Sequence, residues 1–464
     1  MESQARARSR SPRPRSNSQH RSSWSHLMRH TDLIRSSVVL ATEFVRAPQD
    51  LERFATRMCN QISIIGGAHR KALQQVAARP DLITNEIFRR ALKGLFDSNT
   101  PRPTHDIRDQ VKEALALANV QIERVLGVGT IAEVCAISIQ REGTSELHAV
   151  KTVDLKQRDL FKIDFEIFGG NIMGLLSQAL IMVERVPGAR IVRPLVQQVV
   201  NIGNDKKFQE NTLDEFNLHV EVANIHAGSE AFRSAAEVMG RPPQYFQTPK
   251  VIQVSRDGSV LQMELVRGQN LGEAHSASLQ LGEERRVEIA ESLVEIFLHG
   301  LLLGSVVHTD LHPGNVLVNE ETAGITVVDW GLVLQVPAGH RTNVQKLLQG
   351  LHAGTDNDVN FKEIFTALGV TVNIPVEHAR SGNLYTQLAS LFDLVAGARG
   401  ELNLIELLRV MQKCSWPDWL LLWQKSTGAL VNSLSHLKAA DLIDLTQKVK
   451  DTLSILQTVH EMNS

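Results

Sequence analysis

Two short polar loops constrain this chain more than any other feature of its sequence. The first runs from His308 to Asn315, reads HTDLHPGN, and passes directly into the apolar stretch Val316–Val318. The second places Asp329 between apolar residues in the sequence VVDWG. Mg²⁺ prefers oxygen ligands, and phosphoryl transfer needs a carboxylate beside the attacking hydroxyl. We therefore assign Asp310 as the base or water-orienting residue, and Asn315 and Asp329 as Mg²⁺ ligands.

A glycine-containing turn and a lysine precede these loops. Gly127, Gly129 and Thr130 lie at the end of one strand-like segment, and Lys151 lies at the end of another in the sequence HAVK. The order of turn, lysine, H-x-D-x-x-x-x-N and D-x-G matches the ATP site of protein kinases. In that site the lysine contacts the α- and β-phosphates, while glycines let backbone N–H groups approach phosphate. Thr130 offers a further hydroxyl contact to the phosphates of ATP.

A kinase lysine requires a carboxylate partner on a helix of the small lobe. We predict a helix over about Leu213–Ala235, on which Asn217, Glu221 and Asn224 share one face. Glu221 is the preferred partner of the lysine, and Glu215 is the second candidate. The alternative, an exposed acidic helix face without a catalytic role, stays open at this stage.

The order of the predicted elements is helices, then a small sheet with one helix, then a larger helical part. This order predicts an α+β, protein-kinase-like bilobal fold with a helical N-terminal extension. We expect a helical extension over 31–118, a small lobe over 119–268 and a large helical lobe over 269–464. The strands expected in the small lobe are Ile122–Leu126, Ala132–Ile139, Leu147–Val153, Pro249–Val254 and Val260–Leu265.

Residues 1–30 form a separate segment rich in Arg and Ser, in which Glu2 is the only acidic residue. Such a composition cannot bury enough apolar surface to fold, so we expect a disordered tail. An organellar transit peptide and an Arg–Ser interaction segment are the two alternatives.

Overall composition narrows the remaining possibilities. The chain has 464 residues, a net charge of −2 and three cysteines without a C-x-x-C pair. These values predict no nucleic-acid partner, no disulfide framework and no zinc site. We also find no apolar run long enough for a transmembrane helix.

Several separated motifs resemble the UbiB/ADCK family of atypical kinases. The helical extension contains KALQ, from Lys71 to Gln74, and then RPDL, which are similar to the K-x-G-Q and R-P-D-L signatures of that family. The family's later motifs have counterparts in EFN, EVAN, PKV and MELVRG, so the resemblance covers roughly residues 62–336. Four features depart from the pattern: Leu73 replaces Gly, Asn217 replaces Asp, Leu311 replaces Pro, and a glycine loop replaces the family's Ala-rich loop.

This resemblance implies an ATP- and Mg²⁺-dependent kinase or ATPase tied to coenzyme Q and other prenyl-lipid metabolism. It implies that Lys71 and Gln74 face the ATP site near Glu215. It also implies a mitochondrial or plastid location, a membrane lipid surface and a prenyl-lipid biosynthetic complex as partners. A cytoplasmic location is the alternative.

Two other functions remain open from the sequence. HTDLHPGN with DWG also resembles the aminoglycoside/choline phosphotransferases, which act on small molecules. A nucleotide-binding pseudokinase scaffold is the third possibility, although the complete set of Lys151, Asp310, Asn315 and Asp329 argues against a dead site.

Overall fold

The structure is a computed structural model, and its chain divides into two compact units. One unit comprises Met1–Asn99 and Lys156–Leu213, and the other comprises Thr100–Leu155 and Asp214–Ser464. The described residues are 28–29, 31, 35, 50–77, 87–88, 90–92, 101–141, 144–169, 199–272, 281–303, 306–319, 324–352, 360–373, 383–394, 414–439 and 443–463. The predictions for residues 1–27 and for most of 78–100 lie outside this set.

The first unit is helical in the residues that the structure describes. It contains α2 (Leu51–Ile65), α3 (Gly67–Ala77), α6 (Leu155–Gly169) and α9 (Lys206–Asp214). Apolar and aromatic side chains pack these helices together, as in the edge-to-face contact of Phe165 on α6 with Phe208 on α9.

A buried ion pair joins three segments of the first unit. The carboxylate of Asp164 on α6 is fully buried and accepts two hydrogen bonds from Arg29, at 2.6 and 2.8 Å. The same carboxylate accepts the backbone N–H of Ala68 at the start of α3, at 2.9 Å. Gly67 permits this approach because it has a φ of +58°, and a Cβ there would lie 2.2 Å from Asp164 Oδ2.

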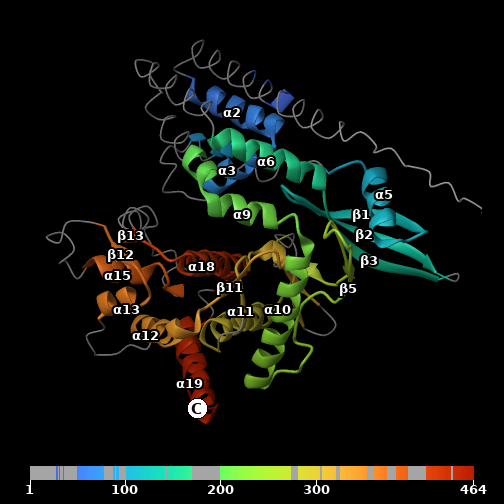
Figure 1. The fold of residues 1–464 in the computed structure, drawn as a ribbon. Helices are drawn as coiled ribbons and strands as arrows, with labels where there is room; N and C mark the ends of the chain where they lie inside the picture. Colours follow the sequence, from blue (N-terminus) through green and yellow to red (C-terminus); the bar gives the residue numbers. More distant parts are fainter. Residues whose placement is uncertain are drawn as a thin grey trace, which may run out of the picture. The chain divides into compact units, whose positions relative to one another are not determined.

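The second unit begins with a five-stranded antiparallel sheet in the order β1-β2-β3-β6-β5 (Figure 1). Helix α5 (Thr104–Leu115) packs on this sheet through its apolar face of Ile107, Val111 and Leu115. Helix α10 (Leu218–Val238) packs on the same sheet through β5 and β6. The strands are β1 (Val120–Val128), β2 (Ala132–Arg141), β3 (Thr144–Val153), β5 (Val251–Val254) and β6 (Val260–Glu264).

The remainder of this unit is mostly helical around a second small sheet in the order β4-β10-β9-β7. Its strands are β4 (Phe246–Gln247), β7 (Gln269–Asn270), β9 (Val316–Val318) and β10 (Ile325–Val327), and β8 (Val306–His308) pairs with β11 (Val333–Gln335). A second strand pair joins β12 (Thr371–Val372) to β13 (Cys414–Ser415). The helices are α11 (Glu283–Leu303), α12 (Arg341–His352), α13 (Phe361–Ala367), α15 (Asn383–Ser390), α18 (Asp418–His436) and α19 (Leu445–Asn463), with short 3₁₀ turns at Pro313–Asn315 and Ala338–His340.

A small sheet with one long helix, followed by a helical part that carries short strand pairs, is the kinase-like α+β arrangement predicted from the sequence. That prediction of fold class is confirmed. Within the described residues, no helix combines the length and the apolar character needed to cross a bilayer.

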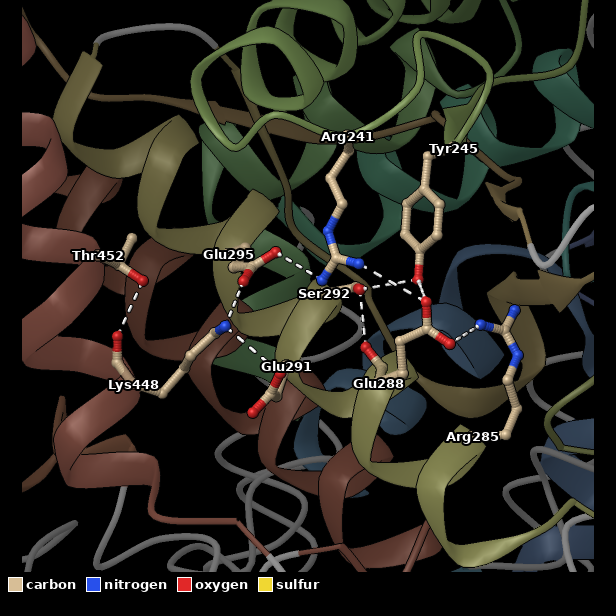
Figure 2. Close-up of polar contacts among 9 residues, drawn as sticks. All are labelled: Arg241, Tyr245, Arg285, Glu288, Glu291, Ser292, Glu295, Lys448 and Thr452. Carbon is tan, nitrogen blue, oxygen red and sulfur yellow. Dashed lines mark hydrogen bonds and ion pairs between the residues drawn. The ribbon is translucent and has the colours of Figure 1, made fainter.

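A polar network fastens helix α19 to helix α11 (Figure 2). Lys448 lies 2.5 Å from Glu295 and 3.4 Å from Glu291. Arg241, which follows α10, lies 3.6 Å from both Glu295 and Glu288. Because the Glu295 side chain is only 8% exposed, its charge depends on these two cations for compensation.

The predicted helix over Leu213–Ala235 is wrong in one respect, since it is two helices. Helix α9 ends at Asp214, and α10 starts only after Asn217, whose side chain caps it by accepting the N–H of His219 at 3.2 Å. The N–H of Leu218 donates to Gly258 instead of to a helical carbonyl, at 2.9 Å. Asn217 therefore acts as an N-cap and does not share a helical face with Glu221.

The predicted strands are present, with different ends. β1 extends from Val120 to Val128, so Gly127 lies inside the strand and pairs with Val134. The strand predicted to start at Ala132 extends to Arg141. The strand predicted to start at Leu147 already begins at Thr144.

Candidate functional site

The candidate site is centred on Lys151, near the end of β3. Its ammonium lies 2.7 Å from Glu221 Oε2 and 2.6 Å from Asp329 Oδ1. Three residues that are far apart in the sequence thus meet at one ion-pair cluster. Glu221, the preferred partner from the sequence, makes the ion pair with the lysine. Glu215 lies exposed in the turn between α9 and α10.

The sheet and α10 together set this geometry. β3 is the central strand, with β2 and β6 on its two sides, and Lys151 pairs with Val134 and Leu261. Glu221 stands in the first turn of α10, directly after the cap at Asn217. The side chains of Lys151 and Glu221 are 11% and 6% exposed, so their charges attract each other in surroundings poorer in water than the surface.

The charges in this cluster stabilise one another. Burial alone would lower the pKa of Lys151, but Asp329 and Glu221 outweigh it, and the pKa is raised. The charge of Lys151 lowers the pKa of Asp329 to about 2, against the opposing effect of desolvation. Burial raises the pKa of Glu221, with Lys151 opposing that shift. At neutral pH the cluster therefore holds a protonated lysine and an ionised Asp329.

Asp329 sits in an unusual backbone conformation that turns its side chain outward. Its φ is +62°, a left-handed value that is uncommon outside glycine and that Asp tolerates better than most residues. Although Lys151 beside it is buried, the side chain of Asp329 is 55% exposed. The carboxylate thus binds the lysine and also remains accessible to a cation from solvent.

Helix α10 and the Asp329 loop are in direct contact. Asn224 Nδ2 donates to the backbone oxygen of Trp330 at 2.9 Å. The indole of Trp330 is fully buried, and it donates to the carbonyl of Val327 at 2.8 Å. Gly228 lies against this ring, and a Cβ at that position would come within 2.2 Å of it. The helix that carries Glu221 is therefore locked to the loop that carries Asp329.

His308 connects the Asp329 loop to the Asp310 loop. Its Nδ1 accepts the N–H of Asp310 at 3.2 Å, so the proton is on Nε2, which donates to the carbonyl of Asp329 at 2.9 Å. Burial lowers the pKa of His308 and keeps the ring neutral, as this pair of hydrogen bonds requires. A third link runs from the N–H of Val328 to the carbonyl of Asn315, at 2.9 Å.

The two predicted metal ligands fit a Mg²⁺ ion by the chemistry of their donor atoms. Asn315 Nδ2 donates to the carbonyl of Asp310 at 3.0 Å, so Oδ1 is the end of the amide that is oriented away from this bond. Asp329 adds an accessible carboxylate. Amide and carboxylate oxygens are the ligands that Mg²⁺ takes, usually together with water and phosphate oxygens.

The predicted phosphate loop is a tight hairpin. Gly129 N–H donates to the carbonyl of Ala132 at 2.7 Å, which closes the turn between β1 and β2. A Cβ at Gly127 would meet no atom within 4 Å, so packing does not explain that glycine. Thr130 lies at the tip of the same turn. Contact of these three residues with phosphate stays a prediction.

Lys71 and Gln74 lie on α3 in the first unit. Gln74 is buried and Lys71 is half-buried, while Leu73 between them is fully packed in the core. Their predicted place facing the ATP site stays a prediction.

Lys425 on α18 belongs to no motif that would mark it as part of the site. Its Nζ lies 3.8 Å from Asp310 Oδ2. On the same helix, Ser433 donates a buried hydrogen bond of 2.5 Å to the carbonyl of Leu311, 122 residues away. A single lysine in a helical stretch forms no motif, so only the three-dimensional arrangement reveals it.

Comparison with known proteins agrees with this geometry. Residues 177–362 match the model of the ABC1 atypical kinase-like domain, a span that includes Glu221, Asp310, Asn315 and Asp329 and leaves Lys151 outside. The chain is 25% identical over 238 residues to "Probable protein kinase UbiB" of Vibrio vulnificus strain CMCP6, covering 49% of this chain and 40% of that protein. The protein of the same description from strain YJ016 is 24% identical over the same length. The match spans less than half of either relative.

The fold and the ion-pair cluster thus define an atypical kinase-like domain, which supports a kinase-like, ATP-binding function. The domain match and the two relatives support the resemblance to the UbiB/ADCK family that the motifs predict.

Proposed function

We propose that this chain binds ATP with Mg²⁺ and catalyses ATP hydrolysis or phosphoryl transfer as an atypical kinase or ATPase of the UbiB/ADCK type. The observation that carries the proposal is the position of one buried ammonium, on Lys151, between Glu221 and Asp329. Kinases require this lysine–glutamate pair, together with a metal-binding aspartate, for phosphoryl transfer. Here both contacts of Lys151 are already formed at 2.6–2.7 Å.

The proposed roles follow from the positions of the side chains. Lys151 binds the α- and β-phosphates, and Glu221 keeps its ammonium directed toward them. Asn315 and Asp329 hold Mg²⁺, which neutralises charge on the phosphate oxygens. The hairpin of Gly127, Gly129 and Thr130 contacts the phosphates in this proposal, with Gly129 shaping the turn because its own N–H donates to the carbonyl of Ala132.

Asp310 acts on the nucleophile. As the oxygen of the attacking hydroxyl or water forms a bond to the γ-phosphorus, the bond from that phosphorus to the β–γ bridging oxygen breaks and ADP leaves. Asp310 takes the proton of the attacking hydroxyl or water. Because the enzyme mainly orients the reactants and neutralises charge, one well-placed carboxylate is sufficient for this step.

We further propose that the reaction serves prenyl-lipid metabolism of the coenzyme Q type, at a membrane surface and with a biosynthetic complex as partner. The motif resemblance to the UbiB/ADCK family supports this setting. In this proposal Lys71 and Gln74 act at the same ATP site, and the protein works in a mitochondrion or plastid.

The decisive experiment measures Mg²⁺-dependent ATP consumption by the full chain, with and without liposomes that contain cardiolipin. Asp329→Asn serves as the control because it removes the metal-binding carboxylate. We expect turnover that requires Mg²⁺, increases with the liposomes and is abolished in the variant. Nucleotide binding without turnover under any condition would instead favour a pseudokinase scaffold. Turnover on small alcohols without a lipid effect would favour a small-molecule phosphotransferase.

A further inference from the structure

A lysine from the C-terminal helical region lies beside the proposed catalytic carboxylate. Lys425 on α18 has its ammonium 3.8 Å from Asp310 Oδ2, and the two side chains are 48% and 42% exposed. An ion pair that is half-exposed and this long contributes little to stability. The position of Lys425 is therefore not explained by a structural role in holding α18.

Helix α18 is fixed to the catalytic loop by other contacts. Ser433 is fully buried and donates to the carbonyl of Leu311, the residue that follows Asp310. Trp423 and Leu430 of the same helix are also fully buried. These contacts hold the helix, so the ammonium of Lys425 stays near Asp310 without depending on the weak ion pair itself.

The other basic groups of the described site are already engaged. Lys151 binds Glu221 and Asp329, and both ring nitrogens of His308 are hydrogen-bonded, one to the N–H of Asp310 and one to the carbonyl of Asp329. The ring of His312 accepts the N–H of Gly314 at Nδ1, at 2.9 Å, so this nitrogen carries no proton in this arrangement. Among the residues that the structure describes, Lys425 is the ion-pair partner of Asp310.

We propose that Lys425 is a catalytic residue that binds the phosphoryl group during its transfer. This inference rests on the proposed phosphoryl-transfer function. In the transition state, negative charge is spread over the three equatorial oxygens of that group, and Lys or Arg side chains placed there stabilise it. The separation of 3.8 Å from Asp310 lets the ammonium donate to a phosphoryl oxygen while it stays beside the base.

The test compares Lys425→Met, which removes the charge, with Lys425→Arg, which keeps it. Lys362→Met is the matched control, because Lys362 is an exposed lysine on α13. Two quantities are measured for the full chain: ATP turnover at saturating MgATP, and the affinity for MgADP with and without aluminium fluoride. Aluminium fluoride beside MgADP imitates the phosphoryl group in transfer, and analogues of a transition state bind more tightly than ground-state ligands, by about a hundredfold or more.

For Lys425→Met we expect turnover to fall by about a hundredfold, with little change in the KM for ATP. Its affinity for MgADP should equal that of the wild type, while the increase caused by aluminium fluoride is lost. Lys425→Arg should recover most of both quantities, and Lys362→Met should change neither. Thermal unfolding should be the same in all four proteins.

Several outcomes would overturn the assignment. One is a Lys425→Met protein that keeps both its turnover and its response to aluminium fluoride. Another is a parallel loss of MgADP binding, which would place Lys425 in ground-state binding or in folding. A wild type that binds MgADP without any response to aluminium fluoride also refutes the assignment. A wild type without turnover, but with a response that depends on Lys425, would refute the proposed activity and leave the assignment intact.

Discussion

Replacing Gly228 with alanine tests whether α10 and the Asp329 loop act as one unit. The added Cβ would lie 2.2 Å from Cζ3 and 2.3 Å from Cη2 of Trp330, distances that real Cβ contacts do not show. The indole cannot move aside easily. It is hydrogen-bonded to Val327, and it packs edge-on against His308 and Phe232, with ring centroids 4.8 and 5.3 Å apart.

The size of the effect follows from two opposing contributions. Overpacking a core costs about 1–3 kcal/mol, whereas alanine in place of glycine inside a helix gains about 1 kcal/mol. We therefore expect Gly228→Ala to lower the free energy of unfolding by up to about 2 kcal/mol. Separating the helix from the ring by about 1.5 Å to reach ordinary contact also moves Asp329 relative to Lys151. We expect a loss of about tenfold in MgADP affinity, which corresponds to about 1.4 kcal/mol.

Urea unfolding and MgADP titration measure these two effects. Gly428→Ala is the matched control, because Gly428 is an exposed glycine inside helix α18 and a Cβ there meets no atom within 4 Å. The control should be as stable as the wild type or slightly more stable, with unchanged MgADP affinity. If Gly228→Ala behaved like Gly428→Ala in both assays, the proposed coupling between α10 and the Asp329 loop would be wrong.

Three further predictions concern single charged groups. Asp310→Asn should lower ATP turnover about a hundredfold, measured by single-turnover kinetics, and should leave MgADP affinity, measured by titration, unchanged. Unchanged turnover would show that Asp310 has no catalytic role. Because the folded-state pKa of Asp329 is lowered from 3.8 to about 2, its ion pair with Lys151 should stabilise the fold above pH 3.8 and lose that effect as the pH falls toward 2. The difference in unfolding free energy between wild type and Asp329→Asn should therefore shrink across that range, and a constant difference would contradict the cause assigned to the shift. Lys448→Met should destabilise the protein by about 2 kcal/mol, since it leaves the buried Glu295 without its nearest cation. Urea unfolding measures this loss. The double variant Glu295→Gln/Lys448→Met should recover part of it, which checks the pairing.

Much of the site could be predicted from the sequence because kinase-like chemistry depends on local motifs. The loop HTDLHPGN places Asp310 and Asn315 five residues apart, and sequence order alone indicated Lys151 and Glu221. Lys151 and Glu221 each stand in a segment, a strand and a helix, whose hydrophobic pattern has a clear period. The kinase-like fold class followed from the same order of segments.

The other features of the site depend on contacts between distant residues, which the hydrophobic periodicity of a sequence does not predict. The break before α10 arises because Leu218 donates to Gly258 on a neighbouring turn, whereas the apolar pattern continues through the break. Lys425 meets Asp310 only because Ser433 and the buried face of α18 fix that helix on the catalytic loop. The contact of Gly228 with Trp330 is of the same kind, since a helical glycine by itself predicts no partner.

The ion pair of Arg29 with Asp164 determines how far the chain can be shortened from its N-terminal side without leaving a buried charge unpaired. Cleavage on the N-terminal side of Arg29 leaves the guanidinium in place beneath α3. Cleavage after it would leave a fully buried carboxylate without its partner, and breaking such a pair costs about 3–5 kcal/mol. A form that begins beyond Arg29 would keep the hydrogen bond from Ala68 N–H to Asp164, which joins the start of α3 to α6, but the carboxylate that accepts it would lack the charge of Arg29.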